Sequence, residues 1–225
     1  METIHDQRAL LGDEKRIVMK KALLGLVCAL FLSEGVAMAA EEPEFAAVSI
    51  EGDFDIRDYP ALVVATVTVS GSRDEAANAG FRLLAGYIFG GNTRRQRVAM
   101  TAPVVQERAT SERIPMTAPV TQTAAPGGFL VQFALPKGVT VASAPEPLDA
   151  RVQLREVVPA QVAVIRFSGF WSESNYAGNL AKLQAALRAA DLAWTGEPVY
   201  ARYNAPFTPW FMRRNEIWLY LAQAR

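Results

Sequence analysis

The sequence contains the same succession of segments twice, and this repeat constrains the fold more than any other feature. The first copy begins with Ile56–Ala61 and the second with Leu154–Ala160, which places Arg57 and Arg155 98 residues apart. Each copy continues into a β-rich stretch that ends in Ser-Gly, and then into a helical pattern. A repeat of this kind predicts two related structural units that must pack against each other to bury their apolar faces.

The helical patterns predict one long helix in each copy. The first runs from about Arg73 to Ile88, because Ser72 and Glu75 have the spacing of a capping box and a Gly-Gly-Asn stop follows. The second runs from about Glu173 to Ala190. Its apolar residues follow helical spacing and predict one buried stripe: Tyr176, Leu180, Leu183 and Leu187.

Further β-type segments follow each predicted helix, and Pro145–Asp149 is the natural seam between the copies. These segments are Arg97–Gln106, Arg113–Thr123 and Phe129–Leu135 in the first copy, and Glu197–Tyr203 and Glu216–Leu221 in the second. We therefore expect an α+β domain in which duplicated strand-helix-hairpin units form a distorted antiparallel β-barrel or sheet. Two helices should flank it, and a pseudo-twofold axis should relate the units.

A shorter repeat lies within the first copy. The sequence RVAMTAPV, at Arg97–Val104, returns as RIPMTAPV at Arg113–Val120. Because proline inside a strand pattern marks an edge, an end or a bulge, Pro103 and Pro119 predict matched irregularities in two neighbouring strands.

Residues 1–39 are predicted to be an N-terminal extension with a cleavable signal peptide. A basic start at residues 19–21 precedes the apolar run Ala22–Leu32, and Ala37–Ala39 offers the small residues that a signal peptidase reads. The apolar run is shorter than the roughly 20 residues of a spanning helix, so no stable membrane span is expected after cleavage. An uncleaved N-terminal anchor is the alternative.

Cleavage near Ala39/Ala40 leaves a chain without histidine or cysteine, because the single residues of each type are His5 and Cys28. Nucleophiles of the Ser-His-Asp or Cys-His type, zinc sites built on these ligands, and disulfides are then excluded. Equal numbers of basic and acidic residues, 23 of each, argue against a nucleic-acid partner. We expect residues 40–225 to form a single monomeric domain that is periplasmic or secreted.

Four stretches resemble the SOUL haem-binding protein family: the two MTAPV copies, VQLREVVPAQVAVIRFSGF (152–170) and ARYNAPFTPWFMRRNEIWLY (201–220). The resemblance extends from about Phe45 to the C-terminus. It implies the family fold, a distorted β-barrel or two-layer sheet flanked by two helices and built from a duplicated unit. It also implies non-covalent binding of haem or another porphyrin rather than catalysis. The RRNE motif at 213–216 either binds ligand or pins the last strand.

The resemblance further implies an apolar groove beside the first helix, with basic side chains near the propionates. Arg82 and Arg94 have the charge and the planar fork that suit a carboxylate. Since no histidine is available, the candidate axial ligands are Met100, Met116, Met212 and the six tyrosines, although a buried methionine is usually core filler. The candidate tetrapyrrole contacts lie on the first helix or soon after it: Asn78, Phe81, Arg82, Leu84, Ala85, Ile88, Arg94, Met100 and Met116. The apolar members also fit the core face of a helix.

Two other classes of function stay open. One is a non-haem small-molecule binder, because the duplicated arrangement also resembles GyrI-like effector-binding domains. A cleft between the halves would then hold an amphipathic or aromatic ligand against Trp171, Trp194 or Trp210. The other is an enzyme with a carboxylate as general base, for which the candidates are Glu156, Glu173 and Glu216. No spacing identifies a catalytic pair among them, so we expect a binding protein rather than an enzyme.

Overall fold

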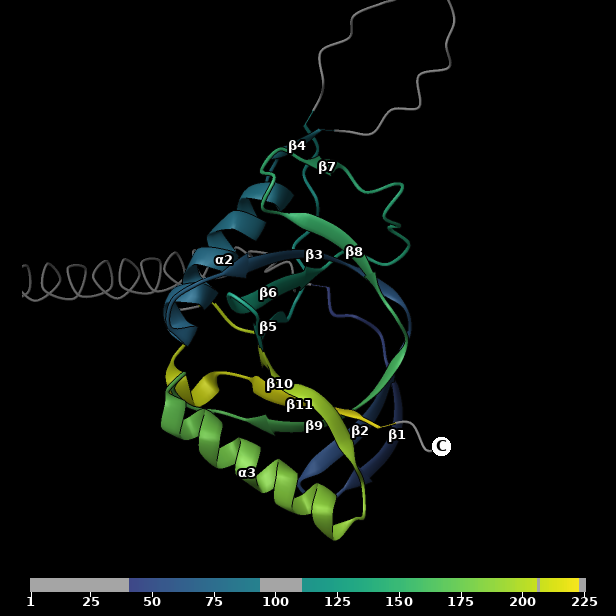
Figure 1. The fold of residues 1–225 in the computed structure, drawn as a ribbon, viewed down its shortest axis with the longest axis vertical. Coiled ribbons are helices and arrows are strands. Elements are labelled where there is room, and N and C mark those ends of the chain that lie inside the picture. Colours follow the sequence, from purple (N-terminus) through teal and green to yellow (C-terminus); the bar gives the residue numbers. More distant parts are fainter. Residues whose placement is uncertain (1–40, 94–110, 206, 223–225) are drawn as a thin grey trace, which may run out of the picture. The chain divides into compact units, whose positions relative to one another are not determined.

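The computed structural model describes residues 41–93, 111–205 and 207–222, which form an α+β domain with a large antiparallel sheet and two long helices (Figure 1). No helix in this described part of the chain is long and apolar enough to cross a membrane. The elements are, in chain order, β1 (Ala46–Glu51), β2 (Phe54–Tyr59), β3 (Leu62–Val69), α2 (Arg73–Ile88), β4 (Asn92–Thr93), β5 (Val120–Ala125), β6 (Gly128–Ala134), β7 (Glu146–Pro147), β8 (Gln153–Val157), β9 (Ala160–Phe167), α3 (Glu173–Ala189), β10 (Trp194–Arg202), η1 (Trp210–Met212) and β11 (Asn215–Leu221).

Both long helices lie where the sequence predicts them. The capping box of α2 is complete: the Ser72 hydroxyl accepts the backbone N–H of Glu75, and the Glu75 carboxylate accepts the backbone N–H of Ser72. Ser172 begins α3 in the same manner, because its hydroxyl accepts the backbone N–H of Asn175. Each cap satisfies backbone donors that the first turn of a helix leaves free.

The pairing of the strands confirms the duplication residue by residue. Arg57 in β2 lies opposite Val162 in β9, and Arg155 in β8 lies opposite Val64 in β3. Arg155 follows Arg57 by 98 residues, and Val162 follows Val64 by the same number, so the two pairings are equivalent. The first strand of each copy therefore joins the sheet of the other copy, and the strand order is β1-β2-β9-β11-β10-β5-β6-β3-β8.

The pseudo-twofold axis passes between β5 and β10, at the centre of the sheet. Gln122 lies opposite Tyr200 at this point, and the register is the same on both sides of the pair. The strands β2, β9, β11 and β10 thus correspond to β8, β3, β6 and β5 across the axis. One continuous sheet joins the halves.

Of the barrel and the sheet that were expected, the sheet is confirmed, and the extent of one predicted strand needs correction. The sheet is not a closed barrel in the described residues, because β1 pairs only with β2 and β8 only with β3, which leaves two unjoined edges. The second MTAPV copy is not a full strand either. Thr117 makes only an isolated bridge to Glu41, and β5 starts at Val120 after a cis peptide before Pro119. The first copy, at 97–104, lies outside the described residues.

The sheet carries hydrophobic clusters on both faces. The helices lie on the outer side of the curved sheet, α2 over β3 and β6 and α3 over β9 and β11 (Figure 1). We call the opposite side the inner face. Its apolar cluster spans both halves and consists of Tyr59, Val162, Val164, Val199, Ala201 and Trp218. The outer clusters hold the helices, whereas no helix of the described residues covers the inner cluster.

Candidate functional site

Three of the predicted tetrapyrrole contacts form one exposed surface on α2. Asn78, Phe81 and Arg82 lie three and four residues apart, a spacing that places side chains on the same side of a helix, and all three are exposed. Phe81 is 37% exposed, and its ring contacts that of Phe133 in the sheet, with 5.5 Å between the ring centres. The surface thus combines a fixed apolar ring, a cation and an amide.

The structure places the other predicted α2 residues in the core. Leu84 is 0% exposed and Ile88 2%, and both pack between α2 and the sheet, while Ala85 is also buried. A ligand on α2 does not reach Leu84 or Ile88 in this structure. The sequence did not separate the two groups because Phe81, Leu84 and Ile88 share helical spacing, and only the sheet decides which residues it covers.

A residue that the sequence reasoning missed extends this surface. Phe89, the C-terminal cap of α2, is exposed, and the guanidinium of Arg113 lies 5.7 Å from the centre of its ring. Helical spacing could have identified Phe89, because it lies one turn beyond Ala85 and on the side of α2 that bears Arg82. An aromatic ring with a neighbouring cation therefore stands at each end of the exposed stretch.

No axial ligand for iron is identified among the described residues. Met116 is half-buried and packs against the core beneath α2, and both Arg94 and Met100 lie outside the described residues. Across 41–93, 111–205 and 207–222, no group of three or more His, Cys, Asp or Glu side chains is placed to hold a metal ion. Among the described residues, the side chains of a type that ligates haem iron are Met and Tyr.

The three tryptophans expected to line a cleft lie elsewhere. The indole N–H of Trp171 donates to Asn215 at 2.7 Å, Trp194 packs against the core beneath α3, and Trp210 stacks on Phe170. A small cavity on the inner face, lined by residues of both halves, contains Trp218 instead. The tryptophan prediction is therefore wrong for this cavity, because strand register rather than sequence neighbourhood decides which face a side chain joins.

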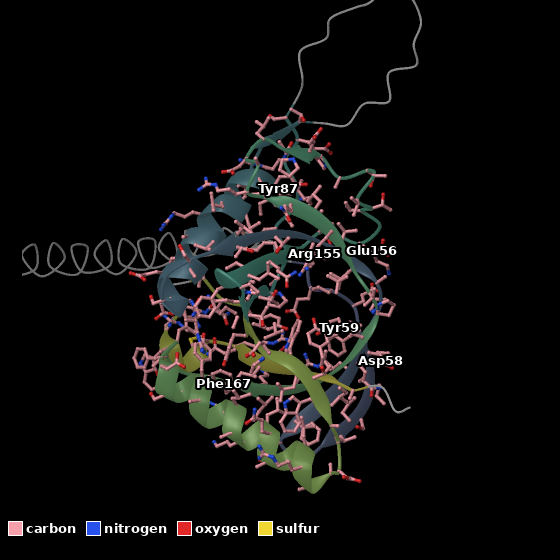
Figure 2. The ribbon with its side chains drawn as sticks, viewed as in Figure 1. Asp58, Tyr59, Tyr87, Arg155, Glu156 and Phe167 are labelled. Carbon is pink, nitrogen blue, oxygen red and sulfur yellow. The ribbon has the colours of Figure 1, made fainter. Side chains whose placement is uncertain are left out.

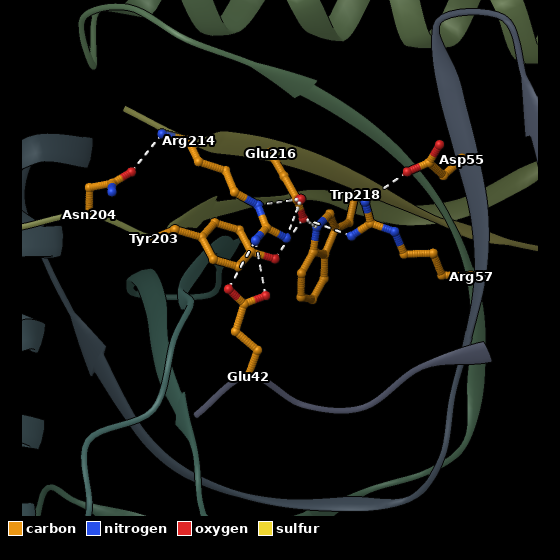
Figure 3. A network of polar contacts seen from close by, with 8 residues as sticks. All are labelled: Glu42, Asp55, Arg57, Tyr203, Asn204, Arg214, Glu216 and Trp218. Atoms are coloured by element: carbon orange, nitrogen blue, oxygen red, sulfur yellow. Dashed lines mark hydrogen bonds and ion pairs between the residues drawn. The ribbon is translucent and has the colours of Figure 1, made fainter. Parts of the chain in front are cut away.

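Beside Trp218 lies a buried charge cluster centred on Glu216, whose side chain is fully buried (Figure 3). One carboxylate oxygen accepts hydrogen bonds from Arg57 Nη1 at 3.0 Å, the Tyr203 hydroxyl at 2.7 Å and Trp218 Nε1 at 2.8 Å. The other accepts Arg214 Nη2 at 2.9 Å. Four donors, two from the strands β2 and β11 and two from the segment between β10 and β11, thus surround one acid, which favours the pinning role of the RRNE motif.

This cluster keeps Glu216 ionised. Burial by itself raises the pKa of the carboxyl, but the hydrogen bond from Tyr203 and the charge of Arg57 outweigh it, and the pKa of Glu216 is lowered. Both carboxylate oxygens already accept hydrogen bonds, so the group is poorly suited to act as a general base. The other two candidate bases, Glu156 and Glu173, are exposed, and Glu173 forms an ion pair with Arg73 at 3.2 Å.

Solved structures share this architecture at low sequence identity. The cryo-EM structure of an EcmrR–DNA complex aligns with 99% of this chain and 74% of its own, with a TM-score of 0.52 and 9% identity. A crystal structure of a hydrolase from Listeria innocua aligns with 78% of this chain and 94% of its own, with a TM-score of 0.50 and 13% identity. Likeness at this level is evidence for the fold alone.

Sequence relatives are more specific. Heme-binding protein 2 of Homo sapiens is 30% identical over 192 residues, which cover 83% of this chain and 88% of that protein. Heme-binding protein 1 of Xenopus laevis is 28% identical over 167 residues, which cover 73% and 82%. The profile of the SOUL heme-binding protein family matches residues 40–220. The chain therefore belongs to the SOUL heme-binding protein family.

Proposed function

We propose that this protein binds haem or a related tetrapyrrole non-covalently on the exposed side of α2. Family membership supports the class of ligand. The observation that carries the location is the shared exposed surface of Asn78, Phe81 and Arg82, which offers an aromatic contact beside a cation. The ring of the macrocycle lies against Phe81 and Phe89, and a propionate meets the Arg82 guanidinium.

Apolar contact and the arginine–propionate pair supply most of the affinity in this proposal. The described chain contains no imidazole or thiolate, so the strongest axial ligands for iron are missing from this surface. The macrocycle with and without iron should therefore bind almost equally well. Leu84 and Ile88 support the surface from beneath by holding α2 against the sheet.

An ultraviolet–visible titration of the purified protein with haemin and with metal-free protoporphyrin tests the proposal. We expect the two dissociation constants to agree within about tenfold, which corresponds to roughly 1.4 kcal/mol. Arg82→Gln should weaken both by about tenfold, since a charge-assisted hydrogen bond contributes roughly 1.5–3 kcal/mol. Lys182→Gln, on the exposed side of α3, is the matched control and should change neither.

Two results would overturn this mode of binding. A hundredfold preference for haemin that disappears in Met100→Ala or Met116→Ala would show that a methionine ligates iron. If neither compound binds, the tetrapyrrole proposal is wrong, and binding of a non-haem small molecule is the remaining hypothesis.

The proposal also includes export and a purely binding role. The apolar run at Ala22–Leu32 and the small residues before Ala40 support cleavage and a periplasmic or secreted monomer. Mass spectrometry of protein from the native envelope should find an N-terminus near Ala40, and an intact Met1 or Met19 would contradict export. Both carboxylate oxygens of Glu216 already accept hydrogen bonds, which supports a protein that binds its ligand without catalysing a reaction.

A further inference from the structure

A small cavity lies on the inner face, on the side of the sheet opposite α2. Its volume is about 60 Å³, well below the roughly 300–1,000 Å³ of pockets for drug-sized ligands. The walls are mostly apolar and come from both halves, including Tyr59, Leu62, Val64, Val162, Trp218 and Tyr220. The cavity is too small for a macrocycle, so only a narrow apolar group suits it.

Two equivalent arginines flank this cavity. Arg57 lies directly opposite Val162 and Arg155 directly opposite Val64, and both valines line the cavity. Residues directly opposite each other in an antiparallel pair project from the same face of a sheet, so both arginines belong to the inner face. Figure 2 shows Arg155 on the inner side of β8.

The two arginines differ in their partners. Arg57 is buried and pairs with Glu216, which lies opposite Arg166 in the ladder of β9 and β11. The counterpart of Arg166 in the first copy is Thr68, and Thr68 lies opposite Leu130. A leucine therefore occupies the place of the acid, and Arg155 is exposed with no ion pair to any carboxylate of the described residues.

Tyr220 adds a second donor close to Arg155. The side chain of Tyr220 lines both the cavity and a wide groove of about 1,270 Å³. Tyr59, Pro60 and Ala160 also line both of them. Burial raises the pKa of the Tyr220 hydroxyl, and the charge of Arg155 is close enough to lower it in part. The hydroxyl stays protonated near neutral pH, and within the described part of the chain it has no hydrogen-bond partner.

We propose that the inner face is a second ligand site, specific for a narrow apolar carboxylate such as an alkyl acid. The carboxylate binds Arg155 and Tyr220, and the alkyl chain enters the cavity from the open groove. The buried acid that this face has in the described residues, Glu216, is already paired with Arg57 and Arg214, so it does not repel a carboxylate ligand. The site lies across the sheet from α2 and does not depend on tetrapyrrole binding.

Isothermal titration of the purified protein with octanoate, and with 1-octanol as its neutral analogue, tests this proposal. We expect octanoate to bind at least tenfold more tightly than 1-octanol, because only the acid satisfies Arg155. Arg155→Gln should weaken octanoate about tenfold or more and leave 1-octanol unchanged, and Tyr220→Phe should weaken octanoate severalfold. Lys182→Gln, an equally exposed cation on α3, should have no effect.

A second variant uses the pseudo-symmetry. Leu130→Glu places an acid where Glu216 stands in the other half, so it should pair with Arg155 and abolish octanoate binding while the protein remains folded. No octanoate binding at millimolar concentration, equal binding of acid and alcohol, or indifference to both Arg155→Gln and Leu130→Glu would overturn the proposal. Displacement of octanoate by haemin in direct competition would also overturn it, because the two sites would then be one. Octanoate binding without haemin binding would overturn only the tetrapyrrole proposal.

Discussion

The two halves of the molecule have the same strand register but use equivalent positions differently. In one half an arginine on the inner face, Arg57, is enclosed with Glu216, Tyr203 and Trp218. In the other half the equivalent Arg155 is exposed, and Leu130 occupies the position equivalent to that of Glu216. The duplicated backbone therefore tolerates a structural role in one copy and an open, ligand-accessible position in the other.

The helices show the same divergence at a pair of equivalent glycines. A Cβ added at Gly80 of α2 would lie 2.6 Å from Val131 of β6, whereas one added at Gly178 of α3 would meet no atom within 4 Å. Helix α2 therefore approaches its sheet closely at this point, and α3 does not. Equivalent residues 98 positions apart are close-packed in one half and free in the other.

The largest expected effect tests the enclosed arginine. Glu216→Leu, which copies Leu130 into the other half, leaves the buried Arg57 with only its ion pair to Asp55 and should lower the free energy of unfolding by about 3–5 kcal/mol. Urea denaturation measures this loss, with Glu156→Leu as an exposed control that should stay within about 0.5 kcal/mol. A loss below 1 kcal/mol for Glu216→Leu would mean that the cluster does not hold the last strand.

The next effect is the response of the same cluster to acid. Because the pKa of Glu216 is lowered in the folded protein, its contribution to stability is complete above the unfolded pKa of about 4.3 and is lost as the pH falls through the lower folded value. Urea midpoints measured between pH 3 and 7 should therefore fall on acidification. In Glu216→Gln the fall should be shallower; an identical slope in both proteins would assign the acid sensitivity to other carboxylates.

A smaller effect should distinguish the helices. Gly80→Ala forces Val131, which is fully buried, to move, and overpacking of this kind should destabilise the protein by about 1–3 kcal/mol. Thermal and urea denaturation both report it. Unchanged stability would show that α2 lies farther from β6 than the structure has it.

The smallest effect has the opposite sign. Gly178→Ala removes backbone freedom from the unfolded chain and meets open space in the folded one, so it should stabilise the protein by about 0.5–1 kcal/mol. The same denaturation curves measure it. Destabilisation by Gly178→Ala would indicate an unrecognised contact on this side of α3.

The sequence predicted the elements that depend on local chemistry. The capping box at Ser72 and Glu75 predicted the start of α2, and the repeated Arg-acid segments predicted matching strands. The exchange of β2 and β8 between the halves was not predicted, because a repeat reports which segments are equivalent but not which of them pair.

The candidate site was predicted only in part. Phe81 and Arg82 lie on the exposed side of α2, but Leu84 and Ile88, which share the same periodicity, lie beneath it. The donors around Glu216 come from residues up to 159 positions apart, and no local pattern joins Arg57 to Glu216. Long-range pairing of this type is set by sheet register, which the sequence expresses only weakly.

The exchanged first strands also govern how the chain reaches its fold. β2 finds its partner only after β9, about a hundred residues later, has been made, and β8 must in turn find β3. Contacts between residues so distant in sequence raise the contact order, and domains with high contact order fold slowly. Neither half is a self-sufficient folding unit, because each lacks a strand that the other supplies. Until both strands have crossed over, β3 and β9 present unpaired edges that favour aggregation.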